Sequence, residues 1–224
     1  MIEKIETQQA TVRLQLLDQY FVLHPSKAIY WEELDLLLIA DLHFGKATHF
    51  RKAGLQVPKQ VATTNQKELI NLLTHFSPDR VLFLGDLFHS TLNQEWETLG
   101  AIFATFPAIS FELVIGNHDI LTAQDYDHIQ LTTYPEPLAI GNFLLTHHPM
   151  SSIPTGQFNF CGHIHPCVWL SGSGKQYLKL PCFFFQEQQC TLPAFGAFTG
   201  MAKQHPVEGD QVFVIAESQV LPVF

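Results

Sequence analysis

Five apolar runs, each followed at once by a short polar motif, restrict the fold of this chain more than any other feature. The runs are residues 36–40, 81–84, 111–115, 143–145 and 158–161. An apolar run without alternation predicts a strand that is buried on both faces. Because such a strand delivers the residues at its end to one edge of a sheet, we expect the five motifs to meet there.

The motifs consist of residue types that bind metal ions. In an extended chain, positions i and i+2 point the same way, so Asp41 and His43 can converge on one ion. Gly85 allows the backbone to turn and approach closely, and the two oxygens of Asp86 can bridge two ions. One such motif alone is common, but five in this order predict a metal site. They are Asp41-Leu42-His43, Gly85-Asp86, Gly116-Asn117-His118-Asp119, Thr146-His147-His148-Pro149 and Gly162-His163-Ile164-His165.

The mixture of carboxylate, imidazole and amide ligands favours manganese, iron or zinc. We expect two divalent ions, manganese by preference, with iron or zinc as alternatives. Two ions about 3.5–4 Å apart can hold a phosphoryl group and lower the pKa of a bridging water. The expected reaction is in-line attack of that metal-bridging hydroxide on phosphorus. His118 is then the candidate general acid or transition-state stabiliser beside the leaving oxygen.

The motif set resembles that of the calcineurin-like metallophosphoesterase superfamily. The family pattern is Asp-x-His, Gly-Asp, Gly-Asn-His-Asp/Glu, a later His and Gly-His-x-His, and the match spans residues 35–166. The resemblance implies that His118 takes the family's catalytic histidine role. It also implies that two ligand sets share one aspartate. One ion would be held by Asp41, His43, Asp86 and His165, and the other by Asp86, Asn117, His147 and His163.

Two adjacent histidines leave one ligand ambiguous. We assign the ligand to His147 because the family's ligand comes directly after the strand. His148 is then expected to point away or to contact substrate.

The residues after the second motif argue against a protein phosphatase. Ser/Thr phosphatases of this superfamily place an arginine shortly after the Gly-Asp, where it clamps a phosphomonoester. Here the motif continues as Leu87-Phe88-His89-Ser90, and no arginine follows Arg80. Those phosphatases also tend to carry Glu where this chain has Asp119. Both departures favour a phosphodiesterase.

A basic stretch follows the first motif. Residues 44–67 contain five of the twelve cations and no acid. The amino-acid sequences of residues 40–54 and 84–90 are similar to those of the ligase-associated DNA damage response endonuclease family. That resemblance implies a role in bacterial DNA repair with a DNA ligase and a helicase as functional partners. Lys46, Arg51 and His89 are the candidate substrate contacts. The alternative for Lys46 and Arg51 is that residues 45–53 form a short solvated helix whose cations only face water.

The sequence therefore predicts a dinuclear metal-dependent phosphodiesterase, a nuclease of DNA repair. The net charge of −9 argues against a general nucleic-acid binder, which needs a broad positive surface. One alternative is thus a small-molecule phosphodiesterase or pyrophosphatase acting on nucleotides or sugar nucleotides. A scaffold that kept the fold and lost catalysis is disfavoured, since all the ligand positions and His118 are present.

Length and patterning predict one metallophosphoesterase domain over residues 1–224. Helices are expected near residues 58–76 and 93–105, and strands near 12–16, 20–23, 28–31, 129–133, 138–145, 168–170, 176–180, 183–185 and 212–215. Two mixed sheets with helices outside, a four-layer α/β/β/α sandwich, fit this order, and the family resemblance implies the same. Without a leader or an apolar run of about 18 residues, we expect a cytoplasmic protein with no membrane partner and with reduced cysteines.

Overall fold

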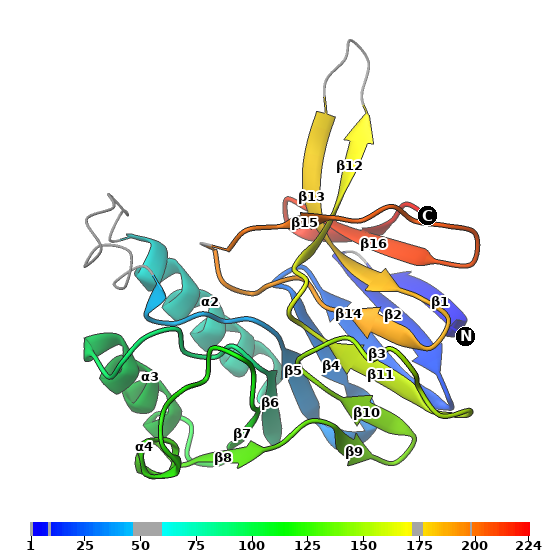
Figure 1. The fold of residues 1–224 in the computed structure, drawn as a ribbon. Helices are drawn as coiled ribbons and strands as arrows, with labels where there is room; N and C mark the ends of the chain where they lie inside the picture. Colours follow the sequence, from blue (N-terminus) through cyan, green and yellow to red (C-terminus); the bar gives the residue numbers. More distant parts are fainter. Residues whose placement is uncertain (1, 9, 47–59, 172–176, 198) are drawn as a thin grey trace.

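Two mixed sheets packed face to face form the centre of the computed structural model (Figure 1). The structure describes residues 1–224 except 1, 9, 47–59, 172–176 and 198. Strands β1 to β5 of the first sheet pair antiparallel, and β5 to β8 pair parallel. In order across the sheet they are β1 (Ile2–Gln8), β2 (Thr11–Leu16), β3 (Gln19–His24), β4 (Ala28–Trp31), β5 (Leu36–Ile39), β6 (Arg80–Leu84), β7 (Ser110–Val114) and β8 (Leu131–Tyr134).

The second sheet is built from the C-terminal half of the chain. Its parallel pairs are β10 with β11, β11 with β14, and β12 with β15. Its order is β15 (Ala202–Lys203), β12 (Pro166–Ser171), β13 (Tyr177–Phe185), β14 (Gln189–Thr191), β11 (Phe158–Cys161), β10 (Phe143–Leu145) and β9 (Leu138–Ile140), with β16 (Gln211–Ala216) on β13 and β17 (Gln219–Pro222) on β16.

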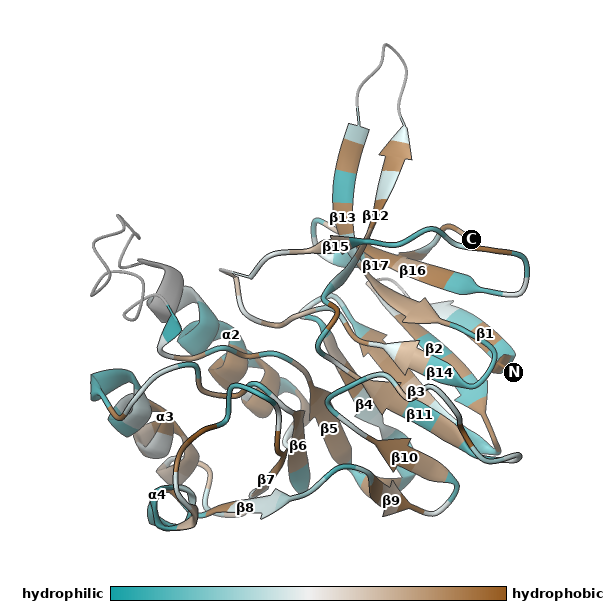
Figure 2. Cartoon of the chain, in the orientation of Figure 1, coloured by the Kyte–Doolittle hydropathy of each residue, from teal (hydrophilic) through white to brown (hydrophobic). Residues whose placement is uncertain are grey.

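Alternation along β5 shows how one strand separates two cores. Leu36 and Leu38 face the core between the sheets, whereas Leu37 and Ile39 face the helices. All four side chains are fully buried, and each contributes about 1.5–3 kcal/mol to the hydrophobic stabilisation. The prediction of a strand buried on both faces is confirmed, and brown segments mark it and its neighbour β6 in Figure 2.

Among the described residues, three α-helices cover the outer face of the first sheet. They are α2 (Gln60–Phe76), α3 (Gln94–Ala104) and α4 (Ala123–His128), and they bury apolar side chains against β5, β6 and β7. The Asn93 side chain begins α3 by accepting the Glu95 N–H, which satisfies one of the free donors of the first turn. The expected fold class is confirmed, as are both expected helices. The described helices include none that is long and apolar enough to cross a membrane.

Several sequence expectations were wrong in detail. Residues 138–145 are not one strand but the pair β9 and β10, because Gly141 adopts a φ of +57° and turns the chain. The polar residues 2–8 form the edge strand β1, which pairs with β2. Helix α4 was not expected; a capping box between Thr122 and Asp125 begins it. The proposed helix start at Pro58 lies outside the described residues.

One hairpin departs from the layered arrangement. Strands β12 and β13 project beyond both sheets at the top of Figure 1. The inner ends of these strands pack with β16 in a third apolar cluster, on the face of β13 opposite to the main core. Strand β12 begins directly after His165, so the hairpin starts at one of the predicted metal ligands.

Candidate metal centre

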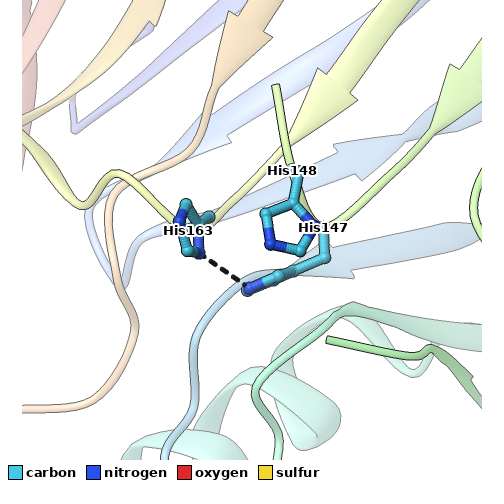
Figure 3. A group of neighbouring side chains, drawn as sticks. All are labelled: His147, His148 and His163. Atoms are coloured by element: carbon cyan, nitrogen blue, oxygen red, sulfur yellow. Dashed lines mark hydrogen bonds between the residues drawn. The ribbon is translucent and has the colours of Figure 1, made fainter. Parts of the chain in front are cut away.

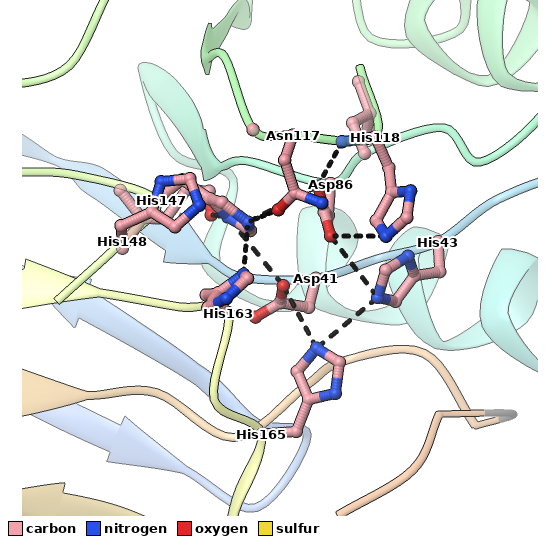
Figure 4. Close-up of polar contacts among 12 residues, drawn as sticks. Asp41, His43, Asp86, Asn117, His118, His147, His148, His163 and His165 are labelled. Carbon is pink, nitrogen blue, oxygen red and sulfur yellow. Dashed lines mark hydrogen bonds and ion pairs between the residues drawn. The ribbon is translucent and has the colours of Figure 1, made fainter. Parts of the chain in front are cut away.

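The ends of five strands bring the motif side chains together at one edge of the two sheets (Figure 4). Strands β5, β6 and β7 of the first sheet supply the first three motifs, and β10 and β11 of the second sheet supply the last two. The structure therefore gathers every predicted ligand in one place. They are Asp41, His43, Asp86, Asn117, His147, His163 and His165.

Four of these side chains form a first group of ligand atoms. Nε2 of His165 lies 3.2 Å from Oδ1 of Asp41 and 3.4 Å from Nε2 of His43. Nε2 of His43 lies 3.9 Å from Oδ2 of Asp86. Atoms bound at about 2.1 Å to a common ion lie about 3–3.4 Å apart in octahedral or tetrahedral geometry. The spacing suits one divalent ion.

Four side chains form a second group around His147. Its Nε2 lies 3.0 Å from Oδ1 of Asn117, 3.1 Å from Nδ1 of His163 and 3.4 Å from Oδ1 of Asp86. The two carboxylate oxygens of Asp86 thus face different groups. This is the arrangement that a bridging carboxylate requires.

The hydrogen bonds of His147 and His165 leave acceptor atoms facing one another in both groups, which a cation would satisfy. Nδ1 of His147 lies 3.0 Å from the Leu84 carbonyl, and Nδ1 of His165 lies 3.0 Å from the Gly200 carbonyl. Since a carbonyl only accepts, each Nδ1 carries a proton, which leaves Nε2 as the nitrogen that can offer a lone pair to an ion. These lone pairs face carboxylate and amide oxygens, which also accept. Oδ1 of Asp41 is buried with no hydrogen-bond partner among the described residues.

Burial keeps the imidazoles in the metal-binding form. It lowers the pKa of His43 to about 2, and the positive charge of Lys46 acts in the same direction. Burial also lowers the pKa of His163, with further lowering from His147 and His148. A histidine must be neutral to bind a metal ion, so both rings are ready to do so near neutral pH.

Two motif glycines are required by close approach. Gly85 has a φ of +75°, and a Cβ there would lie 2.2 Å from Nδ1 of His147. A Cβ at Gly162 would lie 2.6 Å from Oδ2 of Asp41. Any larger residue would displace the side chains that converge on the centre, which agrees with the role expected for Gly85.

The expectation that the ligands sit on extended backbone was wrong. Asp41, His43, Asp86, His163 and His165 all adopt left-handed φ values, between +49° and +68°. The chain turns sharply once each strand ends, and new hydrogen bonds hold the turns, such as His43 N–H to the Asp86 carbonyl at 2.9 Å. The i, i+2 pair His163 and His165 divides between the two groups, whereas the pair Asp41 and His43 stays in one.

His118 lies beside the shared carboxylate. Its backbone N–H donates to Oδ1 of Asp86 at 3.0 Å, and its Nε2 lies 4.0 Å from Oδ2. The side chain is 43% exposed, so it can reach a bound substrate. The ring of His89 packs against that of His118, tilted by 35° with 3.8 Å between the ring centroids. Lys46 is half-buried, and the charges of Asp86 and Asp41 act on its ammonium group. Arg51 lies outside the described residues.

Glu136 contacts both of the adjacent histidines, whose rings lie beside that of His163 in Figure 3. Its carboxylate accepts the backbone N–H of His147 at 2.8 Å and of His148 at 3.0 Å, and lies 2.7 Å from Nδ1 of His148. Burial raises the pKa of Glu136, but these hydrogen bonds outweigh it and lower the pKa overall. His147 therefore turns into the second group, while His148 lies against Glu136 and the His163 ring. Nothing in the sequence signalled Glu136.

Asp119 is a second residue whose part the sequence did not reveal. Its Oδ2 accepts the N–H groups of Asp86 at 2.7 Å and Gly116 at 2.8 Å. Its Oδ1 accepts those of Leu87 at 2.9 Å and Phe88 at 3.2 Å. One buried carboxylate thus joins two ligand-bearing loops. Its place at the end of the third motif was the available signal.

Comparisons with known proteins identify a family and similar solved structures. Residues 34–165 match the family model described as calcineurin-like phosphoesterase. The crystal structure of Pseudomonas putida nuclease MPE superposes with a TM-score of 0.79 at 25% identity, covering 95% of this chain and 100% of that one. A Streptococcus pneumoniae TIGR4 protein described as a predicted phosphoesterase gives a TM-score of 0.35 at 13% identity, covering 84% and 94%. No curated protein matched.

Proposed function

The chain belongs to the calcineurin-like phosphoesterase family, and from that premise we propose that it is a dinuclear phosphodiesterase that cleaves nucleic acid. It is a metal-dependent phosphoesterase, and members of this family hold two metal ions. The observation that carries the proposal is the pair of acceptor groups that share Asp86. Two such groups a few ångströms apart suit the two oxygens of an in-line displacement at phosphorus.

The proposed ligand sets follow the two groups. Asp41, His43, Asp86 and His165 hold one ion, and Asp86, Asn117, His147 and His163 hold the other. Manganese is the proposed ion in both. When bound, two divalent ions supply a more acidic water and neutralise charge on the phosphoryl group. Asp86 fixes the separation of the two sets through its two oxygens.

His118 is the proposed catalytic histidine. Its exposed ring stands beside Asp86, next to where a phosphoryl group would sit. From there Nε2 can hold a proton at the leaving oxygen, a contribution of about 10²–10⁴ in rate. The ring of His89 lies against the His118 ring, with 3.8 Å between the centroids. This contact supports a role for His89 near the substrate.

Lys46 is the proposed contact for a substrate phosphate. Burial lowers the pKa of its ammonium group, whereas Asp86 and Asp41 raise it, so the charge lies within reach of both ligand groups. Arg51 remains a proposed second contact from the sequence alone.

Nucleic acid as substrate is supported by similarity rather than by the overall charge. The superposed Pseudomonas putida protein is a nuclease, and its whole length is covered. Cleavage of DNA in repair, with a ligase and a helicase as functional partners, extends that similarity to this chain. Adjacent ligase and helicase genes would support the repair role.

A manganese-supplemented hydrolysis panel tests the proposal. It compares a phosphomonoester, a bis-aryl phosphodiester, single-stranded DNA, duplex DNA and a sugar nucleotide. We expect turnover of the aryl diester and of DNA, and little of the monoester. The net charge of −9 favours the small-molecule alternative, which wins if the sugar nucleotide is cleaved faster than either DNA. Protein that binds no metal and cleaves none of these would contradict both.

A further inference from the structure

Two aromatic side chains lie exposed on the projecting hairpin. Trp169 is 48% and Tyr177 67% exposed, and their ring centroids lie 6.2 Å apart. Trp169 pairs with Lys179 across the hairpin, and Ser171 pairs with Tyr177. Residues directly opposite in an antiparallel pair share a face, as do residues two apart in one strand. The two rings and Lys179 therefore lie on one face.

Two lysines flank these rings. Nζ of Lys203 lies 4.8 Å from the centre of the Trp169 ring. Nζ of Lys179 donates to the Met201 carbonyl at 3.0 Å. No acidic side chain forms an ion pair with either lysine in the part of the chain that the structure describes. In a chain with a net charge of −9, this face keeps a local positive charge.

The face begins a few residues along the chain from the metal centre. Strand β12 begins one residue after His165, and the Ala202 N–H of β15 donates to the His165 carbonyl at 3.0 Å. Trp169 follows His165 by four residues, which span at most about 13–14 Å. A strand cleaved at the metal centre can reach this face within a few nucleotides.

We propose that Trp169, Tyr177, Lys179 and Lys203 form a stacking platform for a nucleic-acid strand with unpaired bases. The proposal rests on the proposed function. Every base has a flat π-face, so stacking on Trp or Tyr needs no particular sequence. The lysines provide charge for the phosphates between stacked bases. Bases paired within a duplex cannot present these faces, so the platform selects single strands.

Tryptophan fluorescence gives a direct test. The chain has three tryptophans, and Trp31 and Trp96 are buried in the cores. Stacking of an oligothymidylate should therefore quench the emission of Trp169 alone. The titration uses manganese-loaded protein carrying His118→Ala, so that the oligonucleotide stays intact. Trp169→Phe should remove the quenching while largely keeping the affinity; unchanged quenching in that variant would overturn the platform.

Fluorescence anisotropy of a labelled oligothymidylate measures the affinity. Trp169→Ala and Tyr177→Ala should each raise Kd about tenfold, the effect typical of a lost base–aromatic stack. Leu178→Ala is the matched control, because Leu178 is also exposed but pairs with Leu170 on the other face. An equal loss in all three variants, or in none, would contradict the platform and would leave the face to some other partner such as a protein.

Salt dependence tests the lysines separately. The double variant Lys179→Ala, Lys203→Ala should lower the slope of log K against log salt by about 1.4, since each phosphate contact on a single strand contributes about 0.7. Lys4→Ala is the control, because Lys4 pairs with Glu6 on the first sheet. An unchanged slope in the double variant would mean that these lysines touch no phosphate.

Hydrolysis of a bis-aryl phosphodiester separates this proposal from the proposed function. All platform variants, made with His118 intact, should keep the wild-type kcat/KM on that small substrate. Wild-type protein that fails to cleave it contradicts the proposed function. If wild-type protein cleaves the diester but His118→Ala protein binds oligothymidylate without quenching, the platform alone is contradicted.

Discussion

The metal centre and the hairpin platform meet at His165, yet they are built in opposite ways. The centre is enclosed: buried backbone hydrogen bonds hold its loops, and Asp41 and His147 are fully buried. The platform is a two-stranded ribbon whose rings face solvent. Chemistry at phosphorus needs atoms fixed within about half an ångström, whereas stacking on a ring tolerates variation in position. The difference predicts that substitutions at the centre reduce activity on every substrate. Substitutions on the platform should weaken only the binding of nucleic-acid strands with unpaired bases.

Asp86→Asn should have the largest effect of all. The amide removes the charge that both ligand groups share, so both ions should be lost and kcat/KM on the aryl diester should fall by about 10³-fold or more. Metal content per chain by elemental analysis and steady-state kinetics give the two readouts. A variant that keeps both ions and normal turnover would remove the basis for a shared carboxylate.

His118→Ala should separate metal binding from chemistry. The ring provides no atom to either ligand group, so metal content should stay at the wild-type level while kcat falls about 10²–10⁴-fold. Full activity of this variant would contradict the assigned role. Loss of metal would instead show that His118 is a ligand.

Asp119→Asn should show how far metal binding depends on the buried carboxylate that holds the ligand-bearing loops. An amide cannot accept all four N–H groups that the carboxylate accepts, so the loops that carry Asp86 and Asn117 should loosen. We expect metal affinity to fall about 10- to 100-fold. Asp127→Asn is the control, because Asp127 is exposed on α4. Equal affinities in the two variants would mean that Asp119 only fills space.

Glu136→Gln should give the smallest effect at the centre. Because the Glu136 carboxylate is partly exposed and holds only one turn, we expect about tenfold or less loss of affinity, and for one ion only. A metal titration that resolves two sites reads this out, with Glu208→Gln at an exposed position as the control. Equal weakening of both sites would show that Glu136 acts on the whole edge.

The sequence predicted which residues meet but not how they are held. Apolar runs before Asp41 and Asp86 were enough to place these two residues together, because parallel strands bring their ends to one edge of a sheet. His147 follows β10 of the second sheet, so its place beside them depends on the packing of the two sheets. The left-handed turns at Asp41 and His163 left no pattern, since Asp and His adopt them only when surrounding contacts require it. Glu136 contributes by accepting a hydrogen bond from His147, which lies eleven residues later in the chain. No short sequence motif spans that separation.

The hairpin also shows what the sequence could and could not predict. Strands were expected near residues 168–170 and 176–180, and β12 and β13 lie there, although residues 172–176 are outside the described part of the chain. The shared face of Trp169 and Tyr177 depends on register, which the sequence alone does not fix. For the hairpin, the local sequence pattern predicts the two strands, but only the pairing register shows which side chains share a face.

Anomalous scattering from crystals grown with manganese tests the central claim most directly. The account predicts two peaks about 3.5–4 Å apart on either side of the Asp86 carboxylate, one beside His43 and His165 and one beside Asn117 and His163. A single peak, or peaks away from Asp86, would contradict it.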